Sequence, residues 1–214
     1  FKSGTKYYVK VLGVADLISF YSYGIFKKVN SFVAANPSKR DKYGNPVENL
    51  TPWDKAWKYH KEKSKDWTDE HGQEASKYRA KQRFGMGFYD LTSGELIVVD
   101  LSKKQAQAVH AVIKKFEKRL DQMAFELTKE GSGRDTVVSL TPVMFPDEEL
   151  DEVQRKNFEN APKEFDKTRF EGILYEMDDD EQIEKLIEVG FDVSLIGLKP
   201  PAKNDEESEE EYDF

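Results

Sequence analysis

The pattern of hydrophobic and polar positions gives its firmest local prediction near the middle of the chain. Residues 84–91 and 95–101 are rich in β-branched and aromatic side chains and flank the short sequence Thr92-Ser93-Gly94. Two such runs around a glycine-containing loop predict a β-hairpin. Ser102 then precedes apolar residues at helical spacing, namely Ala106, Val109, Val112, Ile113, Phe116 and Leu120. A helix capped by Ser102 and ending near Leu120 is therefore expected.

Further strands are predicted on both sides of this hairpin and helix. Runs of β-type residues occur at 7–14, 124–128 and 136–143, with a turn at 131–133. The segment 16–26 is aromatic and mixed, and it is compatible with a short helix or a strand. The order of strand, long insertion, hairpin, helix and two strands predicts a mainly β (α+β) fold: a five-stranded OB-fold barrel with flanking helices.

The long insertion covers about 36–77. Turn-forming residues dominate its first part, and Thr51-Pro52 is a favourable start for a helix that reaches about Trp67. After Pro146 the chain is acidic and helix-prone, with a short helix expected at 179–189. We therefore predict an OB-fold domain at 1–146, an acidic helical extension at 147–201 and an acidic tail at 202–214.

The net charge of −8 conceals two opposite halves. Residues 1–134 carry 25 Lys and Arg against 16 Asp and Glu, a net of +9, and residues 135–214 carry 8 against 25, a net of −17. A basic body with an acidic end indicates a polyanionic ligand and an internal competitor for it. The last eleven residues include seven acids and end in an aromatic residue, which predicts a solvated, disordered tail. Its aromatic end also predicts docking on other proteins. The expected docking residues are Asp205, Glu206, Glu207, Glu209, Glu210, Glu211, Tyr212, Asp213 and Phe214.

Several classes of function are disfavoured by what the sequence lacks. There is no cysteine, and the three histidines lack the spacing of a zinc site, so neither a metal nor another cofactor is expected. The acidic run 178–181 is better explained as a helix start than as a cation site. No catalytic motif is present, so a non-enzymatic protein is expected. No apolar run is long enough to span a membrane and no signal-peptide pattern is seen, which indicates the cytoplasm.

The insertion combines aromatic and basic residues, as single-stranded nucleic-acid binding requires. Its candidate contacts with bases and phosphates are Trp53, Trp57, Lys58, Tyr59, Lys61 and Trp67. Trp53 and Trp57 fit a core position equally well. If a strand starts near Tyr78, alternation places Arg79, Lys81 and Arg83 on one face as a basic stripe, against the alternative of an ordinary solvated edge.

A glycine-rich turn adds two further candidates. Lys129 and Arg134 flank or belong to the sequence G-S-G at 131–133, where they would approach a phosphate. The sequence lacks the G-K-[ST] ending of a nucleotide-binding loop, so an ordinary hairpin turn explains it as well.

Three segments and the end of the chain carry a family resemblance. They are the hairpin F-G-M-G-F-Y-D-L-T-S-G-E-L-I-V-V-D-L, the helix that follows Ser102, the run F-E-L-T-K-E-G-S-G-R-D-T-V-V-S-L-T-P and the terminal E-E-E-Y-D-F. Together they resemble the single-stranded DNA-binding proteins of tailed bacteriophages, over about residues 5–145 and the tail.

This resemblance implies an OB-fold protein that coats unpaired DNA in phage replication, recombination and repair, in the host cytoplasm. Its tail would recruit DNA polymerase and other replisome or recombination proteins, and would occupy the DNA groove when DNA is absent. By position, Tyr78, Arg79, Lys81 and Arg83 match the DNA-contacting strand. The chain departs from the T-even phage type in having no zinc-binding Cys/His loop and no basic N-terminal motif for cooperative binding.

Two other functions remain open at this point. Residues 135–214 would also suit an acidic protein-interaction module or a DNA mimic that binds basic partners. A metal-dependent nuclease would need a carboxylate cluster that the sequence does not offer. Homo-oligomer formation and the preference for DNA or RNA are left open.

Overall fold

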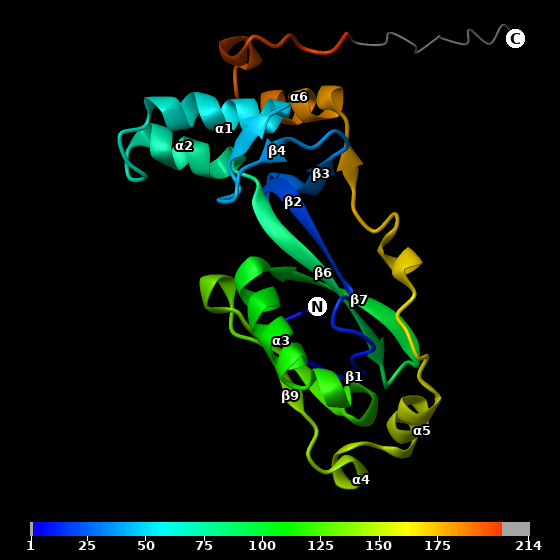
Figure 1. Ribbon diagram of the computed structural model, residues 1–214. Helices are drawn as coiled ribbons and strands as arrows, with labels where there is room; N and C mark the ends of the chain where they lie inside the picture. Colours follow the sequence, from blue (N-terminus) through cyan, green and yellow to red (C-terminus); the bar gives the residue numbers. More distant parts are fainter. Residues whose placement is uncertain (1, 203–214) are drawn as a thin grey trace, which may run out of the picture. The chain divides into compact units, whose positions relative to one another are not determined.

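The computed structural model describes residues 2–202, apart from the side chain of Arg134 (Figure 1). The chain forms two compact units. The described residues of Phe1–Ser22 and Lys81–Tyr175 form unit 1, and those of Tyr23–Ala80 and Glu176–Phe214 form unit 2. None of the described helices is both long and apolar enough to cross a membrane.

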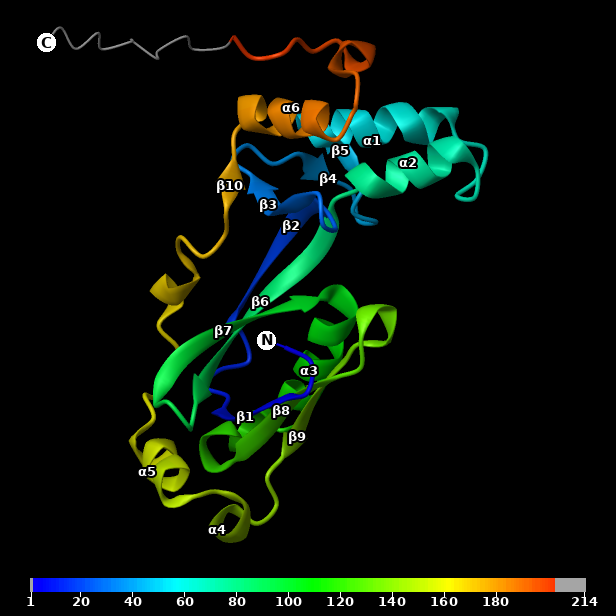
Figure 2. The same cartoon turned by 180° about the vertical axis from the view of Figure 1, so that it is seen from behind.

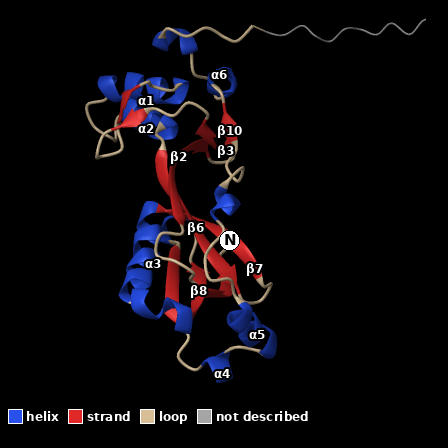
Figure 3. Cartoon of the chain, turned by 45° about the vertical axis from the view of Figure 1, so that its right-hand side comes forward, coloured by secondary structure: helices blue, strands red, loops and turns tan. Residues whose placement is uncertain are grey.

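Unit 1 is an antiparallel sheet with helices. Its strands are β1 (Thr5–Lys10), residues 17–22 of β2 (Leu17–Ile25), β6 (Lys81–Asp90), β7 (Glu95–Ser102), β8 (Ala124–Glu130) and β9 (Val137–Pro142). Its helices are α3 (Lys103–Lys115), α4 (Pro146–Glu149), α5 (Glu152–Asn160) and the 3-10 turns η1 (Glu117–Gln122), η2 (Gly133–Asp135) and η3 (Lys167–Phe170). Figures 2 and 3 show α3 alongside these strands.

The strand β6 is central to the sheet of unit 1. It pairs with β7 along one edge, and with β2 and then β1 along the other. The sheet continues from β1 to β8 and from β8 to β9. Within residues 2–202, β7 and β9 each pair on one edge only, so the sheet is open.

The mixed strand-and-helix character agrees with the prediction, but the closed five-stranded barrel is not confirmed. Closure would require β7 to pair with β9. The helix α3 follows β7 in the chain and packs against β6, β7 and β9. Packing of α3 against these strands therefore replaces the β7–β9 hydrogen bonds that would close a barrel.

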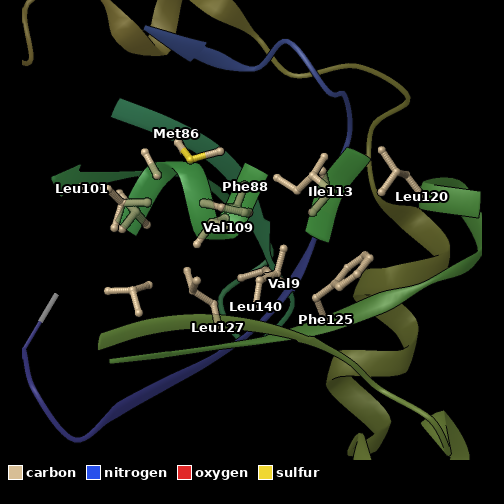
Figure 4. Close-up of a cluster of buried hydrophobic side chains, with 14 residues drawn as sticks. Val9, Met86, Phe88, Leu101, Val109, Ile113, Leu120, Phe125, Leu127 and Leu140 are labelled. Atoms are coloured by element: carbon tan, nitrogen blue, oxygen red, sulfur yellow. The ribbon is translucent and has the colours of Figure 1, made fainter. Parts of the chain in front are cut away.

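An aliphatic core lies between α3 and the sheet of unit 1 (Figure 4). Met86 and Phe88 alternate onto the inner face of β6, as the two-residue period of a strand requires. Val109 and Ile113, four residues apart, point from α3 into the same cluster. Phe88 and Leu127 are completely buried, and burying such a side chain stabilises the fold by about 1.5–3 kcal/mol.

Unit 2 combines short strands with three helices. Its elements are the end of β2, β3 (Val29–Ala34), β4 (Lys39–Arg40), β5 (Pro46–Glu48), α1 (Pro52–Lys63), α2 (Glu70–Tyr78), β10 (Glu176–Met177), α6 (Asp179–Glu188) and the 3-10 turn η4 (Val193–Ile196). The strand β3 pairs with the end of β2 and with β10, and β4 and β5 form a separate hairpin. The helices α1 and α2 pack together.

The core of unit 2 is aromatic. The ring of Trp53 makes edge contacts with Tyr23, Phe32 and Tyr78, at centroid distances of 6.0, 5.2 and 5.7 Å. Edge-to-face pairs of this kind add about 0.5–1.5 kcal/mol to the stabilisation from burial. Some of the aromatic residues that suggested a binding region in the sequence are therefore core residues of unit 2.

A buried ion pair accompanies this aromatic core. Arg40 Nη2 lies 2.7 Å from Asp54 Oδ2, and both side chains are more than nine-tenths buried. The same carboxylate oxygen accepts hydrogen bonds from Tyr23 Oη at 2.7 Å and Ser38 Oγ at 2.6 Å. Burial, and next the charge of Asp54, raise the pKa of the Tyr23 phenol. We call these four residues the Asp54 network.

Several predicted elements are confirmed and others differ. The hairpin is formed by β6 and β7, and segment 16–26 is a strand. The α1 helix ends at Lys63, short of the predicted end near Trp67. In the loop that follows, Asp69 accepts a hydrogen bond from Lys65 N and caps the next helix, α2. The helix α2 was not predicted from the sequence. The expected insertion lies inside unit 2. The expected extension 147–201 is divided, with residues to Tyr175 in unit 1.

Candidate nucleic-acid interface

A groove of about 750 Å³ opens in unit 1 beside the first turns of α3. It is lined by Arg83, Ser102, Lys104, Gln105, Ala108, Lys129, Gly133, Asp135, Thr136, Val137 and Val138. Three of these side chains are cationic and one is a carboxylate, so the lining has a surplus of positive charge. Arg83 and Lys129 were separate candidates in the sequence, and the structure brings both to this groove.

The α3 helix begins at the groove with two lysines. Lys103 and Lys104 occupy its first turn, which contains no acidic residue. The N-terminus of a helix carries partial positive charge, so cations there cost about 0.3–1 kcal/mol, whereas an anion is favoured. A bound phosphate would offset both unfavourable charges. Lys104 was not among the predicted residues, although two lysines directly after a helix-capping serine are visible in the sequence.

The wall opposite the start of α3 is the connection between β8 and β9. Gln105 links the two, because its Nε2 donates to the carbonyl oxygen of Thr136 at 3.3 Å. The connection turns at Gly131, where φ is 79° and a Cβ would lie 2.4 Å from the carbonyl oxygen of Asp135. The predicted turn is thus confirmed. Arg134 belongs to η2 in this connection, and its side chain lies outside the described part of the chain.

Arg83 forms the β6 side of the groove and is already paired. Its Nε and Nη2 donate to Asp100 Oδ1 and Oδ2 at 2.7 and 2.8 Å. A guanidinium has five N–H donors, so three remain after this bidentate contact. Lys81 is exposed and, two residues away on the same strand, shares a face with Arg83.

The predicted strand alternation starting at Tyr78 is wrong in its first part. Tyr78 is the last residue of α2, Arg79 is its exposed C-cap, and the strand begins only at Lys81. The basic stripe is therefore reduced to Lys81 and Arg83 in unit 1.

A second basic cluster occupies the other end of α3. It consists of Lys114, Lys115, Lys118 and Arg119. Cations at a helix C-terminus are favoured by the helix dipole and need no ligand to explain them. The helix dipole disfavours Lys103 and Lys104 at the N-terminus of α3, so these two lysines are stronger evidence for an anionic ligand.

Two of the predicted base-stacking residues are core residues of unit 2. Trp53 is completely buried, and its Nε1 donates to the carbonyl oxygen of Gln182 at 3.1 Å. Tyr78 is also buried, and desolvation raises the pKa of its phenol to about 12. Neither ring has a free face for a base, so the core alternative holds for Trp53 and the expected DNA contact of Tyr78 is wrong.

The other insertion candidates differ in exposure. Trp57 and Tyr59 are partly buried, and the Tyr59 ring carries Lys63 Nζ at 3.9 Å from its centroid. Lys61 is exposed, and Lys58 is exposed but lies 3.8 Å from a carboxylate oxygen of Glu62. Trp67, in the α1–α2 loop, is 81% exposed and can stack on a base.

Two further exposed aromatic residues of unit 2 were missed. Phe26 lies in the β2–β3 turn and Tyr43 in the β4–β5 turn. The available signal was local: Phe26 precedes Lys27-Lys28, and Tyr43 follows Lys42. Phe26 ends a segment expected to be a short helix or a strand, and Tyr43 lies in a segment expected to be a loop.

A histidine pair joins α1 to α2. The Nδ1 atoms of His60 and His71 are 3.0 Å apart, so one nitrogen donates and the other accepts. Burial, and next the charge of His71, lower the pKa of His60. Within residues 2–202, no three His, Asp or Glu side chains converge as metal ligands. Asp178, at the start of the acidic run, caps α6 through Glu181 N at 2.9 Å, in agreement with the helix-start prediction.

Comparison with protein-family models and with curated protein sequences finds no match for this chain. The tail residues predicted to dock on proteins, from Asp205 to Phe214, lie outside the described residues. Any functional proposal therefore rests on the structure itself, above all on the groove of unit 1 and the exposed aromatic side chains of unit 2.

Proposed function

We propose that this protein binds single-stranded DNA without sequence preference and has no catalytic activity of its own. The observation that carries the proposal is the cationic groove of unit 1, where Arg83, Lys104 and Lys129 line one cavity at the positive end of α3. Unpaired DNA presents one phosphate per nucleotide, and a groove with several cations follows such a backbone without reading its sequence.

The order of elements in unit 1 supports an OB-type site. Apart from residues 17–22 of β2, which pair with β6, the strands of unit 1 are β1, β6, β7, β8 and β9 in chain order, with α3 between the third and fourth of these five. The first strand pairs with the second and the fourth, as in a small Greek-key barrel. OB-folds bind oligonucleotides on strands two and three and on the loop between strands four and five. The groove is lined by β6, the end of β7 and the β8–β9 connection, which are the corresponding elements.

The acidic end of the chain completes the proposal. Residues 135–214 have a net charge of −17 against +9 for the preceding part. The last eleven residues alone carry seven acids and no base. A tail of this composition would compete with DNA for a cationic groove and would recruit DNA polymerase and other replication or recombination proteins through its aromatic end. The corresponding biological setting is the replication, recombination and repair of phage DNA in the cytoplasm of a host cell.

The proposal is tested by titrating fluorescently labelled oligo(dT) and duplex DNA with the protein and following anisotropy at several salt concentrations. We expect the oligo(dT) affinity to fall steeply with salt, and duplex DNA to bind more weakly. Replacing Lys104 and Lys129 by Ala should reduce the slope of log affinity against log salt by about 1.4, at about 0.7 per phosphate contact.

The matched control is Lys156→Ala, which removes an exposed lysine from α5 outside the groove. It should leave the slope unchanged. Absence of oligo(dT) binding at low salt would overturn the proposed function. Binding of basic proteins without binding of DNA would instead favour the acidic interaction module.

A further inference from the structure

Two turns of unit 2 each present an exposed aromatic ring beside lysines. Phe26 is 87% exposed, and Lys27 Nζ lies 5.5 Å from its ring centroid. Tyr43 is 72% exposed, and Lys42 Nζ lies 4.9 Å from its centroid. Single exposed apolar side chains are common and need no explanation. The repeated combination of an open ring and adjacent cations is different, because it is what a stacked base and its phosphate require.

Hydrogen bonds hold the ring of Tyr43 on an ordered turn. Asp41 Oδ1 accepts from the backbone nitrogens of Tyr43 and Asn45 at 2.8 and 2.9 Å, and Asn45 Nδ2 donates to Asp41 Oδ2 at 3.1 Å. These hydrogen bonds to the backbone, with the Asn45 amide, lower the pKa of Asp41. The one acid of this turn is thus engaged internally, and Lys42 is left to interact with a ligand.

The turn that carries Phe26 has an unusual backbone. Lys28 N donates to the carbonyl oxygen of Ile25 at 2.9 Å, and Lys27 has φ 62°, a left-handed conformation that glycine or asparagine usually fills. A lysine there costs about 1 kcal/mol or more. The backbone of Lys27 thus conflicts with the local preference of a lysine, and such conflicts are expected at functional sites.

Both turns are anchored to the Asp54 network. Tyr23 lies three residues before Phe26, and its hydroxyl accepts from Arg40 Nη2 at 2.8 Å. Arg40 Nη1 also donates to the carbonyl oxygen of Gly44, next to Tyr43, at 3.1 Å. Figures 1 and 2 both show β2, β3 and β4 beside α1. The Asp54 network therefore joins the two hairpins of unit 2 that carry the aromatic turns, through Tyr23 in β2 and Arg40 in β4.

We propose that the β2–β3 and β4–β5 turns form a second contact site for single-stranded DNA. Phe26 and Tyr43 stack on unpaired bases, while Lys27, Lys28 and Lys42 meet the phosphates. The site rests on the proposed function and extends it to residues that the family resemblance does not assign. The chemistry favours a nucleic acid over a protein partner, because a lysine Nζ lies 5.5 Å from the ring centroid of Phe26 and 4.9 Å from that of Tyr43.

Chain connectivity agrees with this site. Both turns lie in the long segment between β1 and β6, the first two strands of the OB-type order. The connection between strands one and two is the other loop through which OB-folds hold oligonucleotides. Residues 23–80 of unit 2 can thus be understood as an enlarged version of that connection, packed with the segment of the same unit that starts at Glu176.

The test compares oligo(dT) binding by the full-length wild type and by the double variant Phe26→Ala/Tyr43→Ala. Removing a stacking ring costs about 1–3 kcal/mol per base, which corresponds to at least about a 5-fold loss of affinity for each ring. The slope of affinity against salt should not change, because stacking releases no counterions. On an abasic strand of equal length, the double variant and the wild type should bind equally.

The matched control is Phe145→Ala/Tyr175→Ala, which removes two aromatic residues that are 63% and 60% exposed and have no lysine neighbours in sequence. It should bind oligo(dT) like the wild type. A separate variant, Lys27→Ala/Lys28→Ala/Lys42→Ala, should reduce the salt slope by about 2 on both normal and abasic strands. Thermal melting checks that all variants fold.

The outcomes separate this site from the proposed function. If the wild type binds oligo(dT) and the Phe26/Tyr43 double variant binds as tightly, the second site is refuted and the groove of unit 1 stands. If the double variant loses affinity equally on abasic strands, stacking is refuted. If the wild type itself does not bind oligo(dT), the proposed function fails and the second site fails with it.

Discussion

The two units of this protein bury opposite kinds of core. Unit 1 packs aliphatic and phenylalanine side chains between α3 and a sheet. Unit 2 packs Trp53 against tyrosine and phenylalanine rings and buries the Arg40–Asp54 ion pair beside them. Aromatic residues in unit 2 therefore differ in environment: Trp53, Phe32 and Tyr23 fill the core from a helix and two strands, whereas Phe26 and Tyr43 face solvent from turns. Aromatic content alone does not distinguish the exposed residues from the packed ones.

The largest expected effect comes from the ion pair of unit 2. Asp54→Ala leaves Arg40 buried without its counter-charge and removes the acceptor of Tyr23 and Ser38. Breaking a buried pair in this way costs about 3–5 kcal/mol, enough to unfold unit 2 in a marginally stable chain. Chemical denaturation followed by circular dichroism measures it.

The surface pair of Lys39 and Glu48 in the same unit is the matched control. Its atoms are 2.9 Å apart but both side chains are more than half exposed. Glu48→Ala should cost less than about 1 kcal/mol. Equal effects of the two substitutions would show that burial does not distinguish these pairs.

A smaller or similar effect is expected from the aliphatic core of unit 1. Leu127→Ala removes a completely buried side chain from the cluster in Figure 4 and should cost about 2–5 kcal/mol, depending on how far the cavity collapses. Val137→Ala, on the next strand but exposed, should stay within about 0.5 kcal/mol. Comparable losses in the two variants would contradict the described orientation of β8 and β9.

The smallest effect is a pH dependence confined to unit 2. Burial lowers the pKa of His60 below its ordinary value of 6.5, so the unfolded chain binds the proton more readily than the folded one. Stability should therefore fall as pH decreases through 6.5, and level off below the folded pKa.

The groups that face His60 include His71 and Glu74 from α2 and Lys63 from α1. Replacing His60 by Gln should reduce the loss of melting temperature between pH 7.5 and pH 5.5. Carboxylate titrations remain in the variant and set the background. An identical pH profile in the variant and the wild type would show that protonation of His60 is not coupled to folding.

Much of unit 1 was predictable from the sequence because each element has a strong local period. The hairpin of β6 and β7 has a glycine-containing turn, and α3 has apolar residues at helical spacing after Ser102. The groove itself was only partly predictable. Arg83 and Lys129 are 46 positions apart in the chain, and no local pattern indicates that strand pairing through β1 brings them to one cavity.

Unit 2 was harder to predict because its structure depends on long-range contacts. Its strands β4 and β5 have two and three residues, too few for a periodic signal. In the sequence, Trp53 and Tyr78 are candidates for nucleic-acid contact. In the structure, Trp53 packs against Phe32 and Tyr78 packs against Phe191. Arg40, which donates to the carbonyl oxygen of Gly44 beside Tyr43, also reaches Asp54, and this contact between distant positions has no local signal.

Hydrogen exchange of the full-length protein, with and without saturating oligo(dT), tests the central claim most directly. The segments 102–108 and 130–138, the second of which includes the β8–β9 connection, contain most of the residues that line the groove. We expect both segments to exchange more slowly when oligo(dT) is bound, while α5 at 152–160 is unchanged. Bound oligo(dT) with no protection of either groove segment would contradict the assignment of the DNA site to unit 1.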